Sequence, residues 1–233
     1  YLTSLGMKEV KIPSGEITNF PYLKFIAKLS LPVIISTGMS NLSEVQAAIK
    51  FLLNKNSKLD ITLLHCTSLY PAPHKTLNLL AINTLLKEFK MKIGYSDHSN
   101  GNTASIAAIA MGARVIEKHF TINKNFSGPD QKASADIEEF SILIKEIRIL
   151  EDALGNGIKI PHKLELNTAR VARRSWHAKR DIKINYKLNE NDLILLRPGN
   201  QILGNKNIAG YKIKKSIKKG KIIKKEWLED YEI

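Results

Sequence analysis

The fold is decided by residues 32–65, which read Pro32-Val-Ile-Ile-Ser-Thr-Gly-Met-Ser-Asn-Leu-Ser-Glu-Val-Gln-Ala-Ala-Ile-Lys-Phe-Leu-Leu-Asn-Lys-Asn-Ser-Lys-Leu-Asp-Ile-Thr-Leu-Leu-His65. This stretch begins with a β-branched run at 32–36, continues with apolar residues at helical spacing over 42–54, and ends with a second such run at 60–65. A helix between two strands is the connection that a parallel pair requires. The stretch therefore predicts a βαβ unit of a parallel sheet.

The same alternation extends over the first 155 residues and indicates an α/β fold. Strands are predicted at Glu9-Ile12, Pro32-Ser36, Asp60-His65, Lys92-Tyr95 and Ala113-Lys118. Helices are predicted at Pro21-Leu29, Leu42-Asn54, Leu77-Phe89, Gly101-Met111 and Ile137-Leu154, with Ser43 and Asp136 as N-cap residues. A (β/α)₈ TIM barrel contains eight such units in about 250 residues. We therefore expect the C-terminal five units of a barrel that lacks its first three, with an open five-stranded sheet as the alternative.

Polar residues, histidines and glycines follow each predicted strand at its C-terminal end. They are Ser14-Gly15-Glu16, Ser36-Thr37-Gly38, His65-Cys66-Thr67-Ser68, Ser96-Asp97-His98 and His119-Phe120-Thr121. Active sites of barrels and of open parallel sheets form at this edge. Five such ends in succession predict an active site.

The composition is that of a globular protein, with 43% apolar residues in a chain of 233. The longest apolar runs are far shorter than the roughly 20 residues of a membrane helix, so no membrane partner is expected. The single cysteine, Cys66, cannot form an intrachain disulfide and fits a cytoplasmic location. The chain begins at Tyr1 without Met or a recognisable targeting signal, so we expect a trimmed protein or one that begins mid-protein.

The net charge of +14 raises the possibility of a nucleic-acid partner. Residues 159–233 hold 19 Lys and Arg against 8 Asp and Glu, a net charge of +11, so most of the excess lies in the tail. These lysines are spread over strand-like segments without an obvious groove-reading helix or aromatic platform. We interpret them as a solvated surface and expect no nucleic-acid partner, with nucleic-acid binding as the distant alternative.

The tail has a different pattern from the first 156 residues, which we assign to the partial barrel. After a predicted linker at 157–172, residues 178–193 align with residues 213–228, 35 residues further on. Asn185 and Gly220 take equivalent turn positions, and both residue types tolerate a positive φ. Residues 173–233 are therefore predicted to form a small, pseudo-symmetric β-rich domain.

Two histidines, His98 and His119, follow consecutive predicted strands. Neighbouring positions at one sheet edge could bring both imidazoles onto one ion. Two imidazoles with carboxylate or water suit manganese, iron or zinc and do not choose among them. Hydrogen-bonded histidines without a metal are the alternative.

An anion pocket is predicted around the first two strand ends. Lys11 lies on the opposite face of its strand from Ile12, where a buried ammonium needs an anionic partner. That partner is either a phosphate or carboxylate ligand or Glu16 alone. Hydroxyl groups at neighbouring ends, of Ser14, Ser36 and Ser96, could add donors.

Four further residues are candidates for binding, and each also fits an ordinary loop. Ser68 and Tyr70 lie in a proline-braced loop after the third strand. Asp130 lies in the turn Gly128-Pro-Asp130, and Arg197 in the turn Arg197-Pro-Gly199.

Seven motifs, in this order and spacing, resemble the N-acetylneuraminate (sialic acid) synthase family over nearly the whole chain. They are Lys11-Ile-Pro-Ser-Gly-Glu16, Ile35-Ser-Thr-Gly-Met39, Leu64-His-Cys-Thr-Ser-Leu-Tyr-Pro71, Gly94-Tyr-Ser-Asp-His98, Glu117-Lys-His-Phe-Thr121, Gly128-Pro-Asp130 and Leu196-Arg-Pro-Gly-Asn200. The tail resembles the family's antifreeze-like, or SAF, domain. The resemblance implies a partial TIM barrel followed by a SAF domain.

The resemblance also implies a reaction, in which phosphoenolpyruvate condenses with an N-acylated hexose such as N-acetylmannosamine to give a nine-carbon α-keto acid and phosphate. It implies a divalent metal, most commonly Mn²⁺ and otherwise Mg²⁺ or Co²⁺, on His98 and His119. The implied phosphoenolpyruvate ligands are Lys11, Ser14, Ser36, Ser68 and Ser96, and the implied residue that orients or deprotonates a water is Glu16. Sugar-binding positions would be Tyr70, Asp130 and Arg197, the last from the partner subunit of a domain-swapped homodimer.

Alternatives within the family are legionaminic and pseudaminic acid synthases. The contexts of His65-Cys66 and Tyr95-Ser96 favour the sialic and legionaminic branches. Ser68 stands where some members carry asparagine, whose longer side chain reaches further. Without the first three βα units, we expect these 233 residues alone to be poorly soluble or inactive, and a noncatalytic relic is a further alternative.

Overall fold

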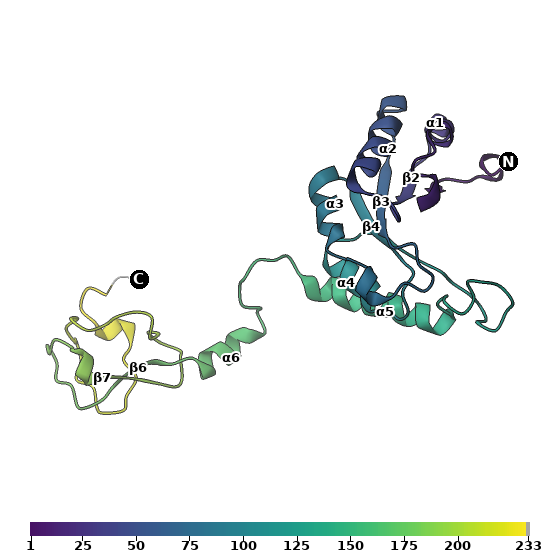
Figure 1. Cartoon of the computed structure of the whole chain (residues 1–233). Helices are drawn as coiled ribbons and strands as arrows, with labels where there is room; N and C mark the ends of the chain where they lie inside the picture. The colour runs from purple at the N-terminus through teal and green to yellow at the C-terminus, as the bar shows by residue number, and fades with distance from the viewer. Residues whose placement is uncertain (232–233) are drawn as a thin grey trace. The chain divides into compact units, whose positions relative to one another are not determined.

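The computed structural model describes residues 1–231 and divides the chain into two compact units, Tyr1–Gly157 and Ile158–Ile233. The first unit contains the βαβ pattern, and the second contains the internal repeat (Figure 1).

The first unit is built on a five-stranded parallel sheet whose order in space is the order in the sequence. Its strands are β1 (Val10–Ile12), β2 (Val33–Ser36), β3 (Ile61–Cys66), β4 (Lys92–Asp97) and β5 (Ile116–Lys118). Crossovers between consecutive neighbours place the connecting helices on one face of the sheet, as in the wall of a (β/α)₈ barrel. The predicted α/β class is confirmed, with all five strands parallel.

Helices follow the strands in the predicted alternation. They are α1 (Phe20–Leu29), α2 (Leu42–Lys55), α3 (Ala81–Phe89), α4 (Thr103–Ala110) and α5 (Ile137–Leu154), with short 3₁₀ turns η1 (Thr3–Leu5), η2 (Ser14–Glu16) and η3 (His74–Thr76). The structure shortens two of the predicted helices, since α3 begins only at Ala81 and α4 covers only Thr103–Ala110.

The two faces of the sheet differ in composition because successive side chains of a strand point to opposite faces. One face carries the buried core against α1 to α4, including Ile12, Ile35, Leu63 and Ile93, each less than 1% exposed and aligned in register. The opposite face carries the side chains of the alternate residues of each strand. At one level of it, Cys66, Ser96 and Glu117 are register partners on three neighbouring strands.

The predicted cap at Ser43 is wrong. Helix α2 begins at Leu42, and its N-cap is Asn41, whose Oδ1 accepts a hydrogen bond from the Glu44 N–H at 3.0 Å. The Glu44 carboxylate accepts the Asn41 N–H at 2.8 Å, which completes a capping box. Ser43 instead donates to Asn41 Oδ1 at 2.6 Å. The cap predicted at Asp136 is confirmed for α5.

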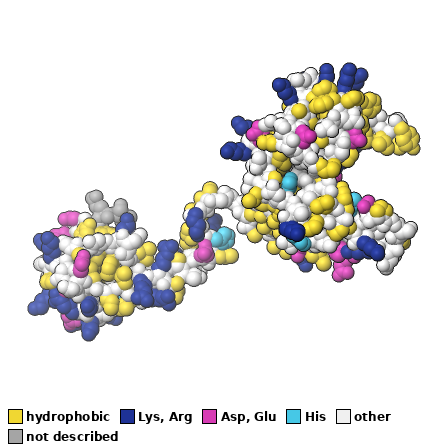
Figure 2. Space-filling model, viewed as in Figure 1, with side chains coloured by type: hydrophobic (Ala, Val, Ile, Leu, Met, Phe, Trp, Pro, Cys, Tyr) yellow, Lys and Arg dark blue, Asp and Glu magenta, His cyan; other side chains and the backbone are white. Residues whose placement is uncertain are grey.

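The second unit contains helix α6 (Glu165–Ala172), which falls inside the predicted linker, and the antiparallel strands β6 (Ser175–Ala178) and β7 (Leu193–Leu196). Two 3₁₀ turns, η4 (Glu190–Asp192) and η5 (Lys225–Trp227), complete it. A small apolar core fills the unit, and Lys and Arg side chains are spread over its surface (Figure 2).

The internal repeat is confirmed as a local two-fold arrangement. Ile182 and Ile217 are equivalent residues of the two repeats, and they exchange both backbone hydrogen bonds, at 2.8 and 2.9 Å. The equivalent turn residues Asn185 and Gly220 both have positive φ, 63° and 79°. The paired core positions are Ala178 and Ile213, Ile182 and Ile217, Leu188 and Ile223, and Leu193 and Leu228.

Within residues 1–231, no helix is both long enough and apolar enough to cross a membrane.

The capping box gives a test of the α2 start. Replacing Asn41 with Ala in the full-length protein should lower the free energy of unfolding by about 1 kcal/mol, because an N–H at the helix start loses its acceptor. The matched variant Ser43→Ala should cost less, since Ser43 bonds only to the cap side chain. Urea denaturation measures both values, and a larger loss for Ser43→Ala would contradict the assignment.

Candidate active site

A cavity of about 400 Å³ lies at the C-terminal ends of the five strands. Eight of the residues predicted from the sequence line it together: Lys11, Ser14, Ser36, Ser68, Tyr70, Ser96, His98 and His119. They come from segments that lie up to 108 residues apart in the chain. The structure therefore brings residues from these strand ends into one cavity, and the role of each residue stays a prediction.

The two histidines lie side by side, with ring centroids 5.2 Å apart. The ring of Tyr70 contacts both, at 4.2 Å from His98 and 5.5 Å from His119. His98 Nδ1 lies 2.8 Å from the carbonyl oxygen of Thr67, which can only accept, so Nδ1 carries the proton of the neutral ring and Nε2 keeps its lone pair. A carbonyl that orients an imidazole in this way is typical of metal-binding histidines.

The donor set fits an open metal site. Among residues 1–231, no group of three or more His, Cys, Asp or Glu side chains is arranged to hold a metal ion. A divalent ion at His98 and His119 would therefore have two imidazole ligands and positions left for water or substrate. Open positions of this kind belong to catalytic rather than structural metal sites.

Glu117 is the site residue that the sequence did not single out. Its carboxylate accepts Lys11 Nζ at 3.0 Å and Ser96 Oγ at 2.7 Å. The alternative that Lys11 pairs with Glu16 alone is wrong. Alternation along β5 was the available signal, since it places Glu117 on the same face as its register partner Ser96.

Two predicted residues of the first unit, Glu16 and Asp130, do not line the cavity. Glu16 ends the η2 turn, and its Oε2 accepts the side-chain amide of Asn19 at 2.6 Å. Asp130 is half exposed, with Oδ2 at 3.9 Å from Nδ1 of His119. Arg197 belongs to the second unit, where its Nε donates to the carbonyl of Ala172 at 2.9 Å.

The Ser36 side chain presents a buried, unpartnered hydroxyl to the cavity. Ser36 is 2% exposed and lines the cavity. Its Oγ is the one buried side-chain polar atom without a hydrogen-bond partner within residues 1–231. A buried hydroxyl without a partner is unfavourable, so this group gains free energy from any polar ligand that bonds to it. The hydroxyl fits an anionic or polar ligand in the cavity.

Gly38 allows the loop after β2 to approach this cavity. A Cβ at Gly38 would lie 2.2 Å from Ser68 Oγ and 2.8 Å from Ser14 Oγ. The Gly38 N–H also donates to Ser14 Oγ at 3.0 Å. A side chain at residue 38 would therefore force both predicted ligand hydroxyls out of their present positions.

Cys66 and His98 influence each other's protonation, with Sγ and Nδ1 at 3.8 Å. Burial raises the pKa of Cys66, but the hydrogen bond and positive charge of His98 outweigh burial and leave this pKa below its ordinary value. Burial lowers the pKa of His98, but the contacts with Cys66 and the Thr67 carbonyl outweigh it and leave this pKa above its ordinary value.

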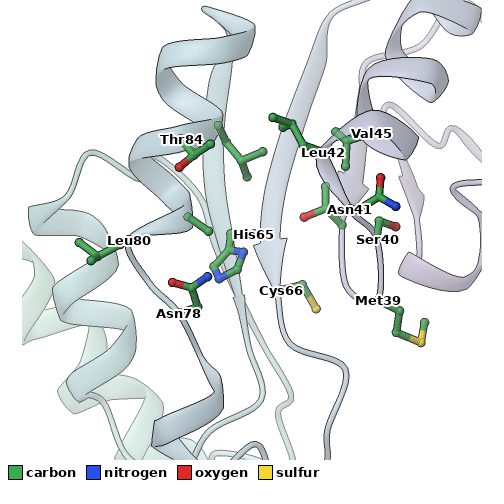
Figure 3. A pocket seen from close by; sticks show the side chains of 13 residues that line it. Met39, Ser40, Asn41, Leu42, Val45, His65, Cys66, Asn78, Leu80 and Thr84 are labelled. Atoms are coloured by element: carbon green, nitrogen blue, oxygen red, sulfur yellow. The ribbon is translucent and has the colours of Figure 1, made fainter.

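A second pocket, of about 390 Å³, lies between the loop after β2 and helix α3 (Figure 3). It shares Met39 and Cys66 with the first cavity, and Asn41 and Asn78 face it from opposite sides. Its lining contains no Lys, Arg, Asp or Glu. Because it offers no charge to an anion, the cavity with Lys11 is the candidate active site.

Comparisons with known proteins agree with this geometry. The NeuB family matches residues 1–159. The N,N'-diacetyllegionaminic acid synthase of Campylobacter jejuni is 50% identical over 202 residues, which cover 86% of this chain and 60% of the relative. The protein of the same name from Legionella pneumophila is 46% identical over 234 residues, covering 98% of this chain and 66% of the relative. The crystal structure of an N-acetylneuraminic acid (sialic acid) synthetase from Leptospira borgpetersenii, in complex with citrate, is 36% identical, with a TM-score of 0.67 over 72% of this chain and 58% of that chain.

The parallel sheet and the cavity at its carboxyl edge define an α/β protein with its site at the strand ends. Within that class, the chain belongs to the NeuB family, the family of the N-acetylneuraminate synthases. The resemblance predicted from the seven motifs is thereby confirmed. The chain spans 60% and 66% of the length of the two curated relatives.

The unpartnered hydroxyl gives a stability test. Replacing Ser36 with Ala in the ligand-free full-length protein should leave the free energy of unfolding unchanged or raise it by up to about 1 kcal/mol, because the variant buries no unpaired hydroxyl. The control Ser134→Ala removes an equally buried hydroxyl that donates to the Asp130 carbonyl at 2.8 Å, and should lower that free energy by about 1 kcal/mol. Urea denaturation decides, and equal losses would show that Ser36 has a partner.

Proposed function

We propose that the full-length protein containing this chain condenses phosphoenolpyruvate with an N-acylated hexose and releases inorganic phosphate. The observation that carries the proposal is the single cavity in which Lys11, an unpartnered Ser36 hydroxyl and the pair of imidazoles meet. A pocket with a cation, hydroxyl donors and an open metal site suits an anionic substrate and a carbonyl electrophile together.

Lys11 and four serines would hold phosphoenolpyruvate. The Lys11 ammonium, which Glu117 orients in the ligand-free site, would offset the charge of the phosphate or carboxylate. The hydroxyls of Ser14, Ser36, Ser68 and Ser96 would donate to its oxygens. Binding would give Ser36 Oγ the partner that it lacks.

His98 and His119 would hold the divalent metal, with Mn²⁺ as the first choice. When bound, such an ion polarises the sugar aldehyde as a Lewis acid. The histidines would place this carbonyl beside the phosphoenolpyruvate carbons, because they line the same cavity as Lys11. Tyr70 packs against both rings and would restrict the sugar's approach.

The reaction joins C3 of phosphoenolpyruvate to the aldehyde carbon, whose oxygen takes up a proton. Water adds at C2, and loss of inorganic phosphate leaves the C2 ketone of a nine-carbon α-keto acid. Glu16 is the proposed residue that orients or deprotonates this water, and it would need to leave its contact with Asn19. Glu117 is the carboxylate that already faces the cavity.

The product is proposed to be a nonulosonic acid of the sialic or legionaminic type. The relative at 50% identity is named for N,N'-diacetyllegionaminic acid, and the structure at 36% identity is named for N-acetylneuraminic acid. This difference in identity favours the N-acylated hexose that gives legionaminic acid over N-acetylmannosamine as the natural acceptor. A pseudaminic acid precursor is the remaining alternative.

The longer protein is proposed to complete a TIM barrel, of which β1 to β5 would be the last five strands. Residues 173–233 would be a SAF domain, and its Arg197 would contact the sugar in the other subunit of a domain-swapped homodimer in the cytoplasm. Asp130, beside His119, would bind the same sugar.

Activity of the histidine variants tests the function. Full-length protein with Mn²⁺ and phosphoenolpyruvate should release phosphate only with an N-acyl hexose, and the keto acid should appear by mass spectrometry. His98→Ala and His119→Ala should each lower the rate at least about 100-fold, because the metal supplies several kcal/mol of charge stabilisation.

The matched control is His74→Ala, because His74 is exposed in the η3 turn outside the cavity. It should keep the wild-type rate. Full activity in both His98→Ala and His119→Ala would refute the metal assignment, and a panel of acceptor sugars would identify the natural substrate.

A further inference from the structure

A buried ion pair lies immediately before the two histidines. Asp97 precedes His98 at the end of β4, and Lys118 precedes His119 at the end of β5. Asp97 and Lys118 are register partners on these neighbouring strands. Lys118 Nζ lies 3.0 Å from Asp97 Oδ2, with side-chain exposures of 4% and 0%.

Asp97 and Lys118 also make hydrogen bonds to neighbouring groups. Asp97 Oδ1 accepts the N–H and the hydroxyl of Ser99 at 2.9 and 2.6 Å. Asp97 Oδ2 accepts Ser105 Oγ, from α4, at 2.7 Å. Lys118 Nζ also donates to the Ser99 carbonyl at 2.8 Å. The pair therefore fixes β4, β5, the loop after β4 and helix α4 to one another.

A buried ion pair is weak evidence for stability alone, since desolvation of two charges offsets their attraction. Its geometric effect is more specific. Alternation turns Asp97 and Lys118 away from the cavity, so that the next residue on each strand turns toward it. The pair joins the two backbones at the last position before each imidazole.

We propose that Asp97 and Lys118 are positioning residues that fix the separation of His98 and His119, so that both rings reach one divalent cation. The inference rests on the proposed function, because it takes the two histidines as metal ligands. It assigns to this pair a role in metal affinity that neither side chain could have by direct contact, since both face away from the cavity.

Strand β4 offers a matched control at its other end. Lys92, its first residue, pairs with Asp60 at 3.2 Å, and both side chains are more than half exposed. The Lys92→Met variant also removes a lysine and an ion pair from β4, but it leaves the histidine end of the strand unchanged.

The test is Mn²⁺ binding by calorimetry to the full-length protein, well below its melting temperature. Lys118→Met and Asp97→Asn should raise the Mn²⁺ dissociation constant about 10- to 100-fold, which is the range for outer groups that orient metal ligands. Lys92→Met should leave it unchanged. The visible spectrum of bound Co²⁺ should change in the two pair variants and not in the control, because it reports ligand geometry.

Circular dichroism checks that the variants fold. Ser105→Ala is a milder variant, because it removes only one hydrogen bond from Asp97. If the pair variants fail to fold, Ser105→Ala decides, and it should weaken Mn²⁺ binding measurably. Unchanged Mn²⁺ affinity in folded pair variants, or in Ser105→Ala where they do not fold, would overturn the inference, even if the melting temperature falls. If instead the wild-type protein binds no Mn²⁺ through His98 and His119, the proposed function itself fails.

Discussion

The structure depends on the alternation of side chains along five parallel strands arranged in chain order. Because strands that follow one another in the sequence are neighbours in the sheet, all crossover helices lie on one face. Every second residue of each strand points to that face, and most of these residues are apolar. The residues between them do not pack against helices. Lys11, Ser36, Ser96 and Glu117 are among the latter, and such polar groups inside a protein must satisfy one another or a ligand.

That requirement links the fold to the chemistry. Glu117 partners Lys11 and Ser96, whereas Ser36 has no partner. At the same edge, the Thr67 carbonyl orients His98, and Asp97 and Lys118 hold the strand ends together behind the histidines. The candidate site is therefore a layer of polar residues in which the remaining unsatisfied group faces the cavity.

Much of the fold was predictable from the sequence, because the spacing of apolar residues and the residues that favour turns are local properties. The five strands, the cap at Asp136 and the 35-residue repeat all follow from local patterns, and the strand ends predicted most of the polar residues that share a cavity. The features that were not predicted depend on register and on side-chain conformation. Glu117 enters the site through its pairing opposite Ser96, and Glu16 turns to Asn19 within a 3₁₀ turn. Asn41 rather than Ser43 caps α2 because the helix begins two residues earlier than a cap at Ser43 requires.

The most direct test of the central claim is a crystal of the full-length protein grown with Mn²⁺ and phosphoenolpyruvate, examined by anomalous diffraction at the manganese edge. The account predicts one anomalous peak bound by His98 and His119, with the phosphoenolpyruvate anion against Lys11 and the Ser36 hydroxyl. A peak away from these histidines, or an anion bound elsewhere while Ser36 Oγ stays without a partner, would contradict it.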